Sequence, residues 1–104
     1  MHSEVRRRIE QLADDDGAVR QQAAAALGEM AEKAAAAVPA LIKALGDRSA
    51  GVRRRAAVAL GQLGPRAREA LPALTRAQND PIHTVRGAAW DALAKVRAST
   101  PPDD

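Results

Sequence analysis

The chain has 104 residues, the size of a single domain, with one tryptophan and no cysteine, phenylalanine or tyrosine. The lack of cysteine excludes a disulfide framework, a thiol nucleophile and a cysteine-based zinc site. The 16 basic and 13 acidic residues leave a net charge of +3, which favours acidic partners only weakly. No apolar run approaches the ~20 residues of a membrane span, and the N-terminus does not resemble a signal peptide. We therefore expect a cytoplasmic protein with no membrane partner.

Alanine is the most frequent residue and occupies 26 positions. Each small side chain buries little apolar area, and burial contributes roughly 25 cal/mol per Å². A core of this kind is stable only where backbones approach closely, as they do between helices with alanine and glycine contact faces. The composition therefore favours closely packed helices.

One sequence pattern occurs three times at a period of 33 residues. A Val-Arg pair stands at positions 19/20, 52/53 and 85/86, and a leucine follows at positions 27, 60 and 93. Each pair opens an alanine-rich segment. A fixed period of this length indicates stacked repeats.

Apolar spacing and turn residues predict six helices. The first carries Val5, Ile9 and Leu12 on one face. Pro39 and Pro72, also 33 residues apart, each lie inside a helical pattern, where proline removes a backbone hydrogen bond and bends the helix. The predicted ranges are about 3–12, 17–31, 33–45, 50–63, 66–77 and 81–98.

Glycine, proline and capping residues set the predicted helix boundaries. We expect Gly46 to follow the third helix with a positive φ. Ser49 is the expected N-cap of the fourth helix. Asp80 is expected to cap a sixth helix that starts at Pro81. Together the helices form one domain over 1–98, with repeats at about 1–31, 32–64 and 65–98, followed by a flexible tail at 99–104.

The pattern resembles a HEAT-like repeat. Its second copy reads DRSAGVRRRAAVALGQLG after VPALIKALG, with an Asp, five residues, an Arg preceded by Val, and an alanine-rich helix ending in Leu-Gly. The match is closest to the short bacterial kind also found in phycobilisome lyases, and it covers about residues 3–98. Ankyrin repeats share the period, but their Thr-Pro-Leu-His signature is absent.

The resemblance implies an all-α fold, an α-solenoid of three helical hairpins. In each hairpin an A-helix and a B-helix would pack antiparallel, with the B-helices lining a concave face. It also implies a ladder between neighbours, built from an aspartate in each A–B turn and an arginine early in each B-helix. The pairs, each six residues apart, are Asp14/Arg20, Asp47/Arg53 and Asp80/Arg86. We interpret these arginines as structural; phosphate binding is the alternative.

The first and last repeats depart from the pattern. Arg8 stands where the second repeat has Leu41, as expected of a polar cap on a repeat without a predecessor. Trp90 replaces Ala24 and Ala57 of the earlier repeats. We expect Trp90 to fill space where a fourth repeat would have packed. The alternative is that it is partly exposed and contacts another chain through the end face.

The sequence contains no catalytic or metal-binding pattern, so we expect no enzyme activity, no metal and no cofactor. His2 and His83 lack a partner at metal-ligand spacing. Gly28 and Gly61 lie inside B-helices, where close packing explains them better than a phosphate loop does. The acidic run Asp14-Asp15-Asp16 lacks the further ligands of a calcium loop.

We expect the function to lie on the concave face, as a protein–protein interaction scaffold for a peptide or protein carrying acidic residues. An ordinary solvated helix face is the alternative. The non-core B-helix positions are Gln21, Gln22, Ala25 and Glu29 in the first repeat, Arg54, Arg55, Val58 and Gln62 in the second, and Gly87, Ala88, Asp91 and Lys95 in the third.

Two other function classes stay open. Nucleic-acid binding is suggested by Arg6-Arg7-Arg8 and Arg53-Arg54-Arg55, but stacking aromatics are nearly absent and the net charge is small. A structural or self-associating module, joined as a homo-oligomer through its end faces, is the other. An engineered array and a fragment of a longer array are also compatible with the repeats.

Overall fold

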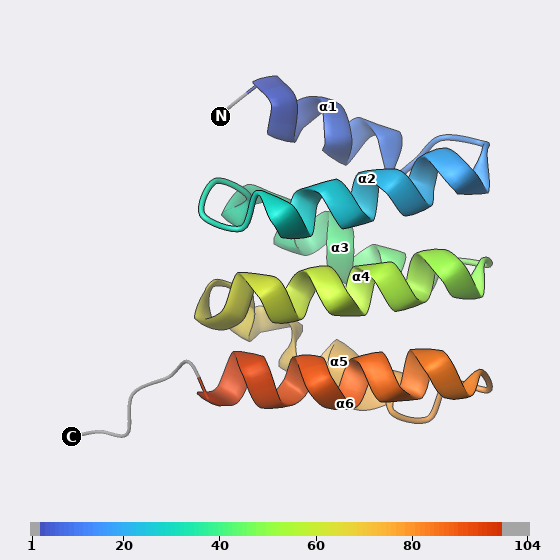
Figure 1. The fold of residues 1–104 in the computed structure, drawn as a ribbon, viewed down its shortest axis with the longest axis vertical. Coiled ribbons are helices and arrows are strands. Elements are labelled where there is room, and N and C mark those ends of the chain that lie inside the picture. Colours follow the sequence, from blue (N-terminus) through green and yellow to red (C-terminus); the bar gives the residue numbers. More distant parts are fainter. Residues whose placement is uncertain (1–2, 99–104) are drawn as a thin grey trace.

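The computed structural model describes residues 3–98, which fold into six α-helices and two 3-10 segments (Figure 1). In chain order these are α1 (Ser3–Gln11), α2 (Gly17–Glu29), η1 (Ala35–Ala37), α3 (Val38–Ala44), α4 (Ala50–Leu63), η2 (Gly64–Ala70), α5 (Leu71–Ala77) and α6 (His83–Ala98). The described residues contain no strand, so the all-α prediction is confirmed. The predicted tail at 99–104 lies outside this range.

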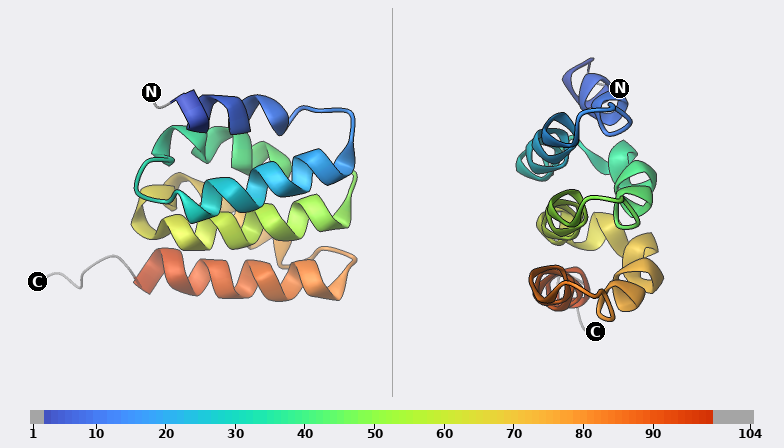
Figure 2. Two further views of the ribbon diagram at one scale, coloured as in Figure 1. Left: turned by 45° about the horizontal axis from the view of Figure 1, so that its top comes forward. Right: turned by 90° about the vertical axis from the view of Figure 1, so that its right-hand side faces the viewer.

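The helices form three hairpins stacked in two layers. The second helices of the hairpins, α2, α4 and α6, lie side by side in one layer (Figure 2). The other layer contains α1, then η1 with α3, then η2 with α5. The predicted solenoid of three hairpins is therefore confirmed. The 33-residue period corresponds to one hairpin, and each B-helix packs against the B-helix of the next hairpin.

The B-helices approach one another closely because glycine stands at the point of contact. A Cβ added to Gly28 would lie 2.9 Å from the Cα of Ala59 on α4. A Cβ added to Gly61 would lie 3.1 Å from the Cα of Ala92 on α6. The partner at each contact is backbone, which cannot move aside as a flexible side chain can. Close packing therefore explains both glycines, as predicted.

The hydrophobic core lies between the two layers and follows the same period. Leu27 and Leu60 are fully buried and Leu93 nearly so. Val52 and Val85 are likewise fully buried, whereas Val19 of the first hairpin is half-buried. At roughly 25 cal/mol per Å² of apolar surface, these larger side chains supply burial that the many alanines cannot.

The third and fifth predicted helices are each divided into a 3-10 segment followed by a short α-helix. The boundary falls at Ala37 and Ala70, whose ψ angles of −6° and −5° depart from the α-helical value. Pro39 and Pro72 then occupy the second position of α3 and α5. The helix is thus interrupted in both repeats, two residues before each proline. The predicted loss of a hydrogen bond is wrong, because a proline in the first turn removes an N–H that has no intrahelical partner.

Two predicted boundaries also need correction. Gly46 does not have a positive φ; within residues 3–98, Gly64 at the end of α4 does, with φ 62°. The sixth helix begins at His83, two residues after Pro81, because Asp80 accepts the N–H of Ile82 and forms a turn before the helix. The predicted cap at Ser49 is confirmed, since its hydroxyl accepts the N–H of Val52.

Candidate functional site

A ladder of partly buried ion pairs joins the A–B turns of successive hairpins. The Arg20 guanidinium donates from Nε to Asp47 Oδ2 at 2.9 Å and from Nη2 to Asp47 Oδ1 at 3.1 Å. Arg53 repeats this fork on Asp80, with distances of 2.7 and 3.2 Å. Each arginine therefore binds the aspartate of the following hairpin, 27 residues away, and not the one six residues before it.

The spacing of six residues corresponds to a different contact. Nη1 of Arg20, Arg53 and Arg86 donates to the backbone carbonyl of the aspartate in the same turn, at 2.8, 2.8 and 2.7 Å. The ladder between neighbours is therefore present, but its pairs need correction: Arg20 and Arg53 bind the carboxylate of the next hairpin, and Arg86 binds no carboxylate among the described residues. Each aspartate also accepts the N–H two residues ahead, which fixes the turn before the B-helix.

The hydrogen bonds of the ladder lower the pKa values of its aspartates. Burial alone would raise the pKa of Asp47, but hydrogen bonds from Arg20 and from the Ser49 N–H outweigh burial and lower that pKa. The pKa of Asp80 is lowered in the same way, by Arg53 and the Ile82 N–H acting against burial. The hydrogen bond to Asp47 raises the pKa of Arg20. The arginines and aspartates of the ladder therefore bind one another as ions and hold the hairpins in register.

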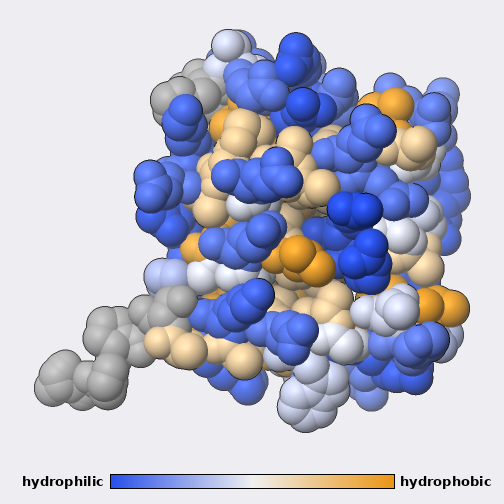
Figure 3. All heavy atoms as spheres, in the orientation of Figure 1, coloured by the Kyte–Doolittle hydropathy of each residue, from blue (hydrophilic) through white to orange (hydrophobic). Residues whose placement is uncertain are grey.

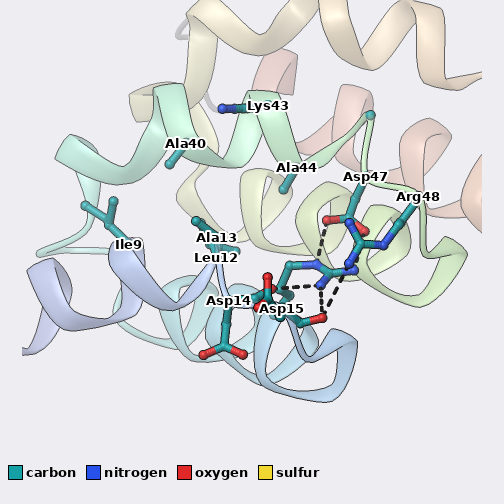
Figure 4. A pocket seen from close by; sticks show the side chains of 12 residues that line it. Ile9, Leu12, Ala13, Asp14, Asp15, Ala40, Lys43, Ala44, Asp47 and Arg48 are labelled. Atoms are coloured by element: carbon teal, nitrogen blue, oxygen red, sulfur yellow. Dashed lines mark hydrogen bonds and ion pairs between the residues drawn. The ribbon is translucent and has the colours of Figure 1, made fainter.

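A hollow lies beside this ladder, between the first two hairpins at their turn ends. Its volume is about 480 Å³, and Figure 4 shows Ile9, Leu12, Asp14, Ala40 and Lys43 around it. A second hollow of about 270 Å³ occupies the same place between the second and third hairpins. Its lining residues Ile42, Leu45, Ala73 and Arg76 are those of the first hollow moved on by 33 positions. The hollows are therefore a product of hairpin stacking.

The outward surface of α2, α4 and α6, which we call the B-helix face, carries the predicted partner-binding residues. Figure 3 shows it as hydrophilic side chains interspersed with small apolar ones. Arg54 is half-buried and Arg55 is exposed at its centre. Within the described part of the chain, neither arginine has an ion pair or a side-chain hydrogen bond.

Two shallow hollows adjoin these arginines. One, of about 110 Å³, is lined by Ala25, Glu29, Arg54, Arg55, Val58 and Gln62. The other, of about 240 Å³, is lined by Ala18, Gln21, Gln22, Ala25 and Arg55. Val58 on the same helix is 39 % exposed, a high value for an aliphatic residue. The arrangement places two cationic groups beside an apolar contact, which suits a ligand with both acidic and apolar side chains.

Three of the predicted face residues also contact a neighbouring hairpin. The Gln62 and Lys95 side chains lie across Gly28 and Gly61 of the preceding hairpin, and Gln21 lies across Gly51 of the following one. Gln22, Glu29 and Asp91 are exposed. Sequence reasoning missed Ala18, which lines one of the hollows; its position next to Val19 at the start of α2 was the available signal.

Trp90 lies on α6 with 63 % of its surface exposed. Trp90 is therefore partly exposed, as the alternative expected, whereas the filling of a fourth repeat's space and a contact with another chain both stay predictions. Ala24 and Ala57, at the same position of the earlier hairpins, are fully buried. The difference arises because no described helix covers the far side of α6 (Figure 1).

The basic runs are divided by the fold. Arg53 is held in the ladder, whereas Arg54 and Arg55 face outward. On α1, Arg7 and Arg8 both bind Glu4, and their hydrogen bonds lower the pKa of that carboxyl. The two clusters therefore present fewer unpaired charges than their sequences suggest.

Within residues 3–98, no three His, Asp or Glu side chains are placed to hold a metal ion. His83 is exposed at the start of α6, and His2 lies outside the described residues. None of the described helices is both long and apolar enough to cross a membrane.

The chain is similar to known helical-repeat proteins. The family described as HEAT repeats matches residues 5–94. A solved structure of the complex of CpcE and CpcF of phycocyanin lyase from Nostoc sp. PCC7120 aligns over 93 % of this chain at 36 % identity, with a TM-score of 0.82. Human deoxyhypusine hydroxylase in complex with glycerol aligns over 90 % at 29 % identity, with a TM-score of 0.76. The curated proteins contain no match.

The chain spans 39 % of the matched phycocyanin lyase chain and 32 % of the hydroxylase chain. The similarity therefore concerns the repeat scaffold, which is a part of each of these proteins.

Proposed function

Since the chain belongs to the HEAT-repeat family, we propose that it is a non-catalytic protein-binding scaffold that holds an acidic peptide or protein on its B-helix face. The observation that carries the proposal is the pair Arg54 and Arg55, which have no acidic partner among the described residues. The ladder arginines Arg20, Arg53 and Arg86, by contrast, each donate hydrogen bonds to groups of this chain. Unpaired arginines beside an exposed aliphatic residue are typical of interface anchors.

The similar structures support protein binding as the class of function. The phycocyanin lyase structure is a complex of two different chains, CpcE and CpcF. Both similar proteins are named for enzymatic activities, but this chain matches about a third of each.

Charge and packing favour a protein ligand over a nucleic acid. Arg53 is committed to Asp80, and Glu29 and Asp91 lie on the same face as Arg54 and Arg55. A phosphate backbone would be repelled by these two carboxylates, whereas a peptide can place acidic groups at the arginines alone.

Selection from a displayed library of random peptides tests the proposal without a known partner. Peptides enriched on the immobilised protein should carry Asp or Glu together with an aliphatic residue. Binding of those peptides should be lost on the Arg54→Glu/Arg55→Glu variant. The control is Arg6→Glu, an exposed arginine on α1 in the other layer, away from the B-helix face and the ladder. Equal binding to the double variant and the wild type would contradict the proposal.

A further inference from the structure

The ladder has two open ends that match each other. Arg86 donates from Nη1 to the Asp80 carbonyl, as Arg20 and Arg53 do in their own turns. Its Nε and Nη2, which correspond to the atoms that bind the next aspartate, have no partner among the described residues. At the other end, Asp14 accepts the Asp16 N–H and has no arginine on its carboxylate.

The first hairpin exposes the other half of the same contact. Ala59 and Ala92, where α4 and α6 meet the preceding hairpin, are at most 1 % exposed. Ala26, their counterpart on α2, is half-buried, as is Val19. The outer side of the first hairpin therefore presents the surface against which the preceding hairpin packs in the two internal interfaces.

We propose that these two end faces are complementary halves of one further inter-hairpin interface, which a second copy of this chain would complete, and that Trp90 and Ala94 on α6 block this interface. The second copy would supply Asp14 to the fork of Arg86 and Ala26 to the outer side of α6. The charge complementarity of Arg86 and Asp14 and the continuity with the two internal interfaces support this occupant.

Trp90 and Ala94 oppose the contact through their size. The positions equivalent to Ala94 are Gly28 and Gly61, where an added Cβ would lie 2.9 and 3.1 Å from the facing Cα atoms. An alanine there forces the helices apart. The positions equivalent to Trp90 are alanines with no exposed surface, so an indole has no room in the same packing.

The consequence concerns the assembly state. A head-to-tail contact between identical chains joins two different surfaces, so it continues into open chains unless its rotation closes a ring. A large residue and an extra methyl group on the last helix prevent such growth.

The test restores the residues of the second hairpin, in the variant Trp90→Ala/Ala94→Gly. Both positions are exposed, so the fold is expected to persist, which circular dichroism can verify. Sedimentation velocity with refractive-index detection is needed, because this variant has no aromatic residue. The wild type should sediment as one species at all concentrations, whereas the average mass of the variant should rise with concentration.

Two further changes test the ladder contact in that variant. Adding Arg86→Gln, or separately Asp14→Asn, should weaken self-association at least about 30-fold, as expected when one member of a buried charge pair is removed. Asparagine at 14 keeps an acceptor for the Asp16 N–H. The proposal is overturned if Trp90→Ala/Ala94→Gly stays monomeric, if its association survives both additional changes, or if the wild type itself assembles.

Discussion

The stacking of the B-helices can be tested with one substitution placed at three depths of packing. Glycine to alanine raises helix propensity by about 1 kcal/mol wherever the new methyl group has space. At Gly87 on α6 no atom lies within 4 Å of the added Cβ, so Gly87→Ala should stabilise the fold by about that amount. The position is exposed and serves as the matched control.

At Gly28 the same methyl group meets the Ala59 backbone at 2.9 Å, and at Gly61 it meets the Ala92 backbone at 3.1 Å. Overpacking of this kind costs about 1–3 kcal/mol, which offsets or exceeds the gain in propensity. Gly28→Ala should therefore be the least stable of the three variants and Gly61→Ala intermediate. Relative to Gly87→Ala, the melting temperature of Gly28→Ala should be lower by at least about 4–8 °C.

The assay is thermal unfolding followed by circular dichroism for the wild type and the three variants. If all three substitutions raise the melting temperature equally, the B-helices are not in backbone contact at Gly28 and Gly61. The account of the period as a stack of closely packed hairpins would then be incorrect.

Three further outcomes follow from the ladder and the exposed indole. The pKa values of Asp47 and Asp80 are lowered in the fold, so the stability that these carboxylates contribute is present above their unfolded pKa of about 4 and is lost as pH falls below it. Melting temperatures measured between pH 7 and pH 2 should show this loss. A flat profile would argue against the ladder. Asp47→Asn should cost about 1–3 kcal/mol at pH 7 and reduce that pH dependence, as measured by denaturant unfolding. Trp90→Ala should change stability by less than about 0.5 kcal/mol, and acrylamide should quench the emission of wild-type Trp90 as it does for an exposed indole; protection from acrylamide would show that another surface covers it.

The architecture could be predicted from the sequence because the same pattern occurs three times. Val19, Val52 and Val85 mark the start of each B-helix at one register, and the range predicted for α4 was confirmed at both ends. The glycines at 28 and 61 were correctly assigned to close packing. These features depend on local pattern and on periodicity, which a single sequence displays directly.

The ladder partners could not be obtained from spacing. Asp47 and Arg53 are close in sequence, but the direction of the Arg53 side chain carries its fork to Asp80 in the next turn. The sequence also did not show which face residues contact a neighbouring hairpin. Gln62 and Lys95 cover glycines of the preceding hairpin, which requires knowledge of the stacking offset.

Neighbouring arginines of α4 have different roles, structural for Arg53 and binding for Arg55, and two single variants test this division. Arg53→Gln removes the fork to Asp80, whereas Arg55→Gln alters an exposed group without an ion pair in the described structure. Melting temperature and affinity for one library-selected acidic peptide should be measured for both. We expect Arg53→Gln to lower the melting temperature and to keep the affinity at temperatures where the variant is folded. We expect Arg55→Gln to keep the melting temperature and to lower the affinity. If both variants lose stability and affinity together, the division between structural and binding arginines is contradicted.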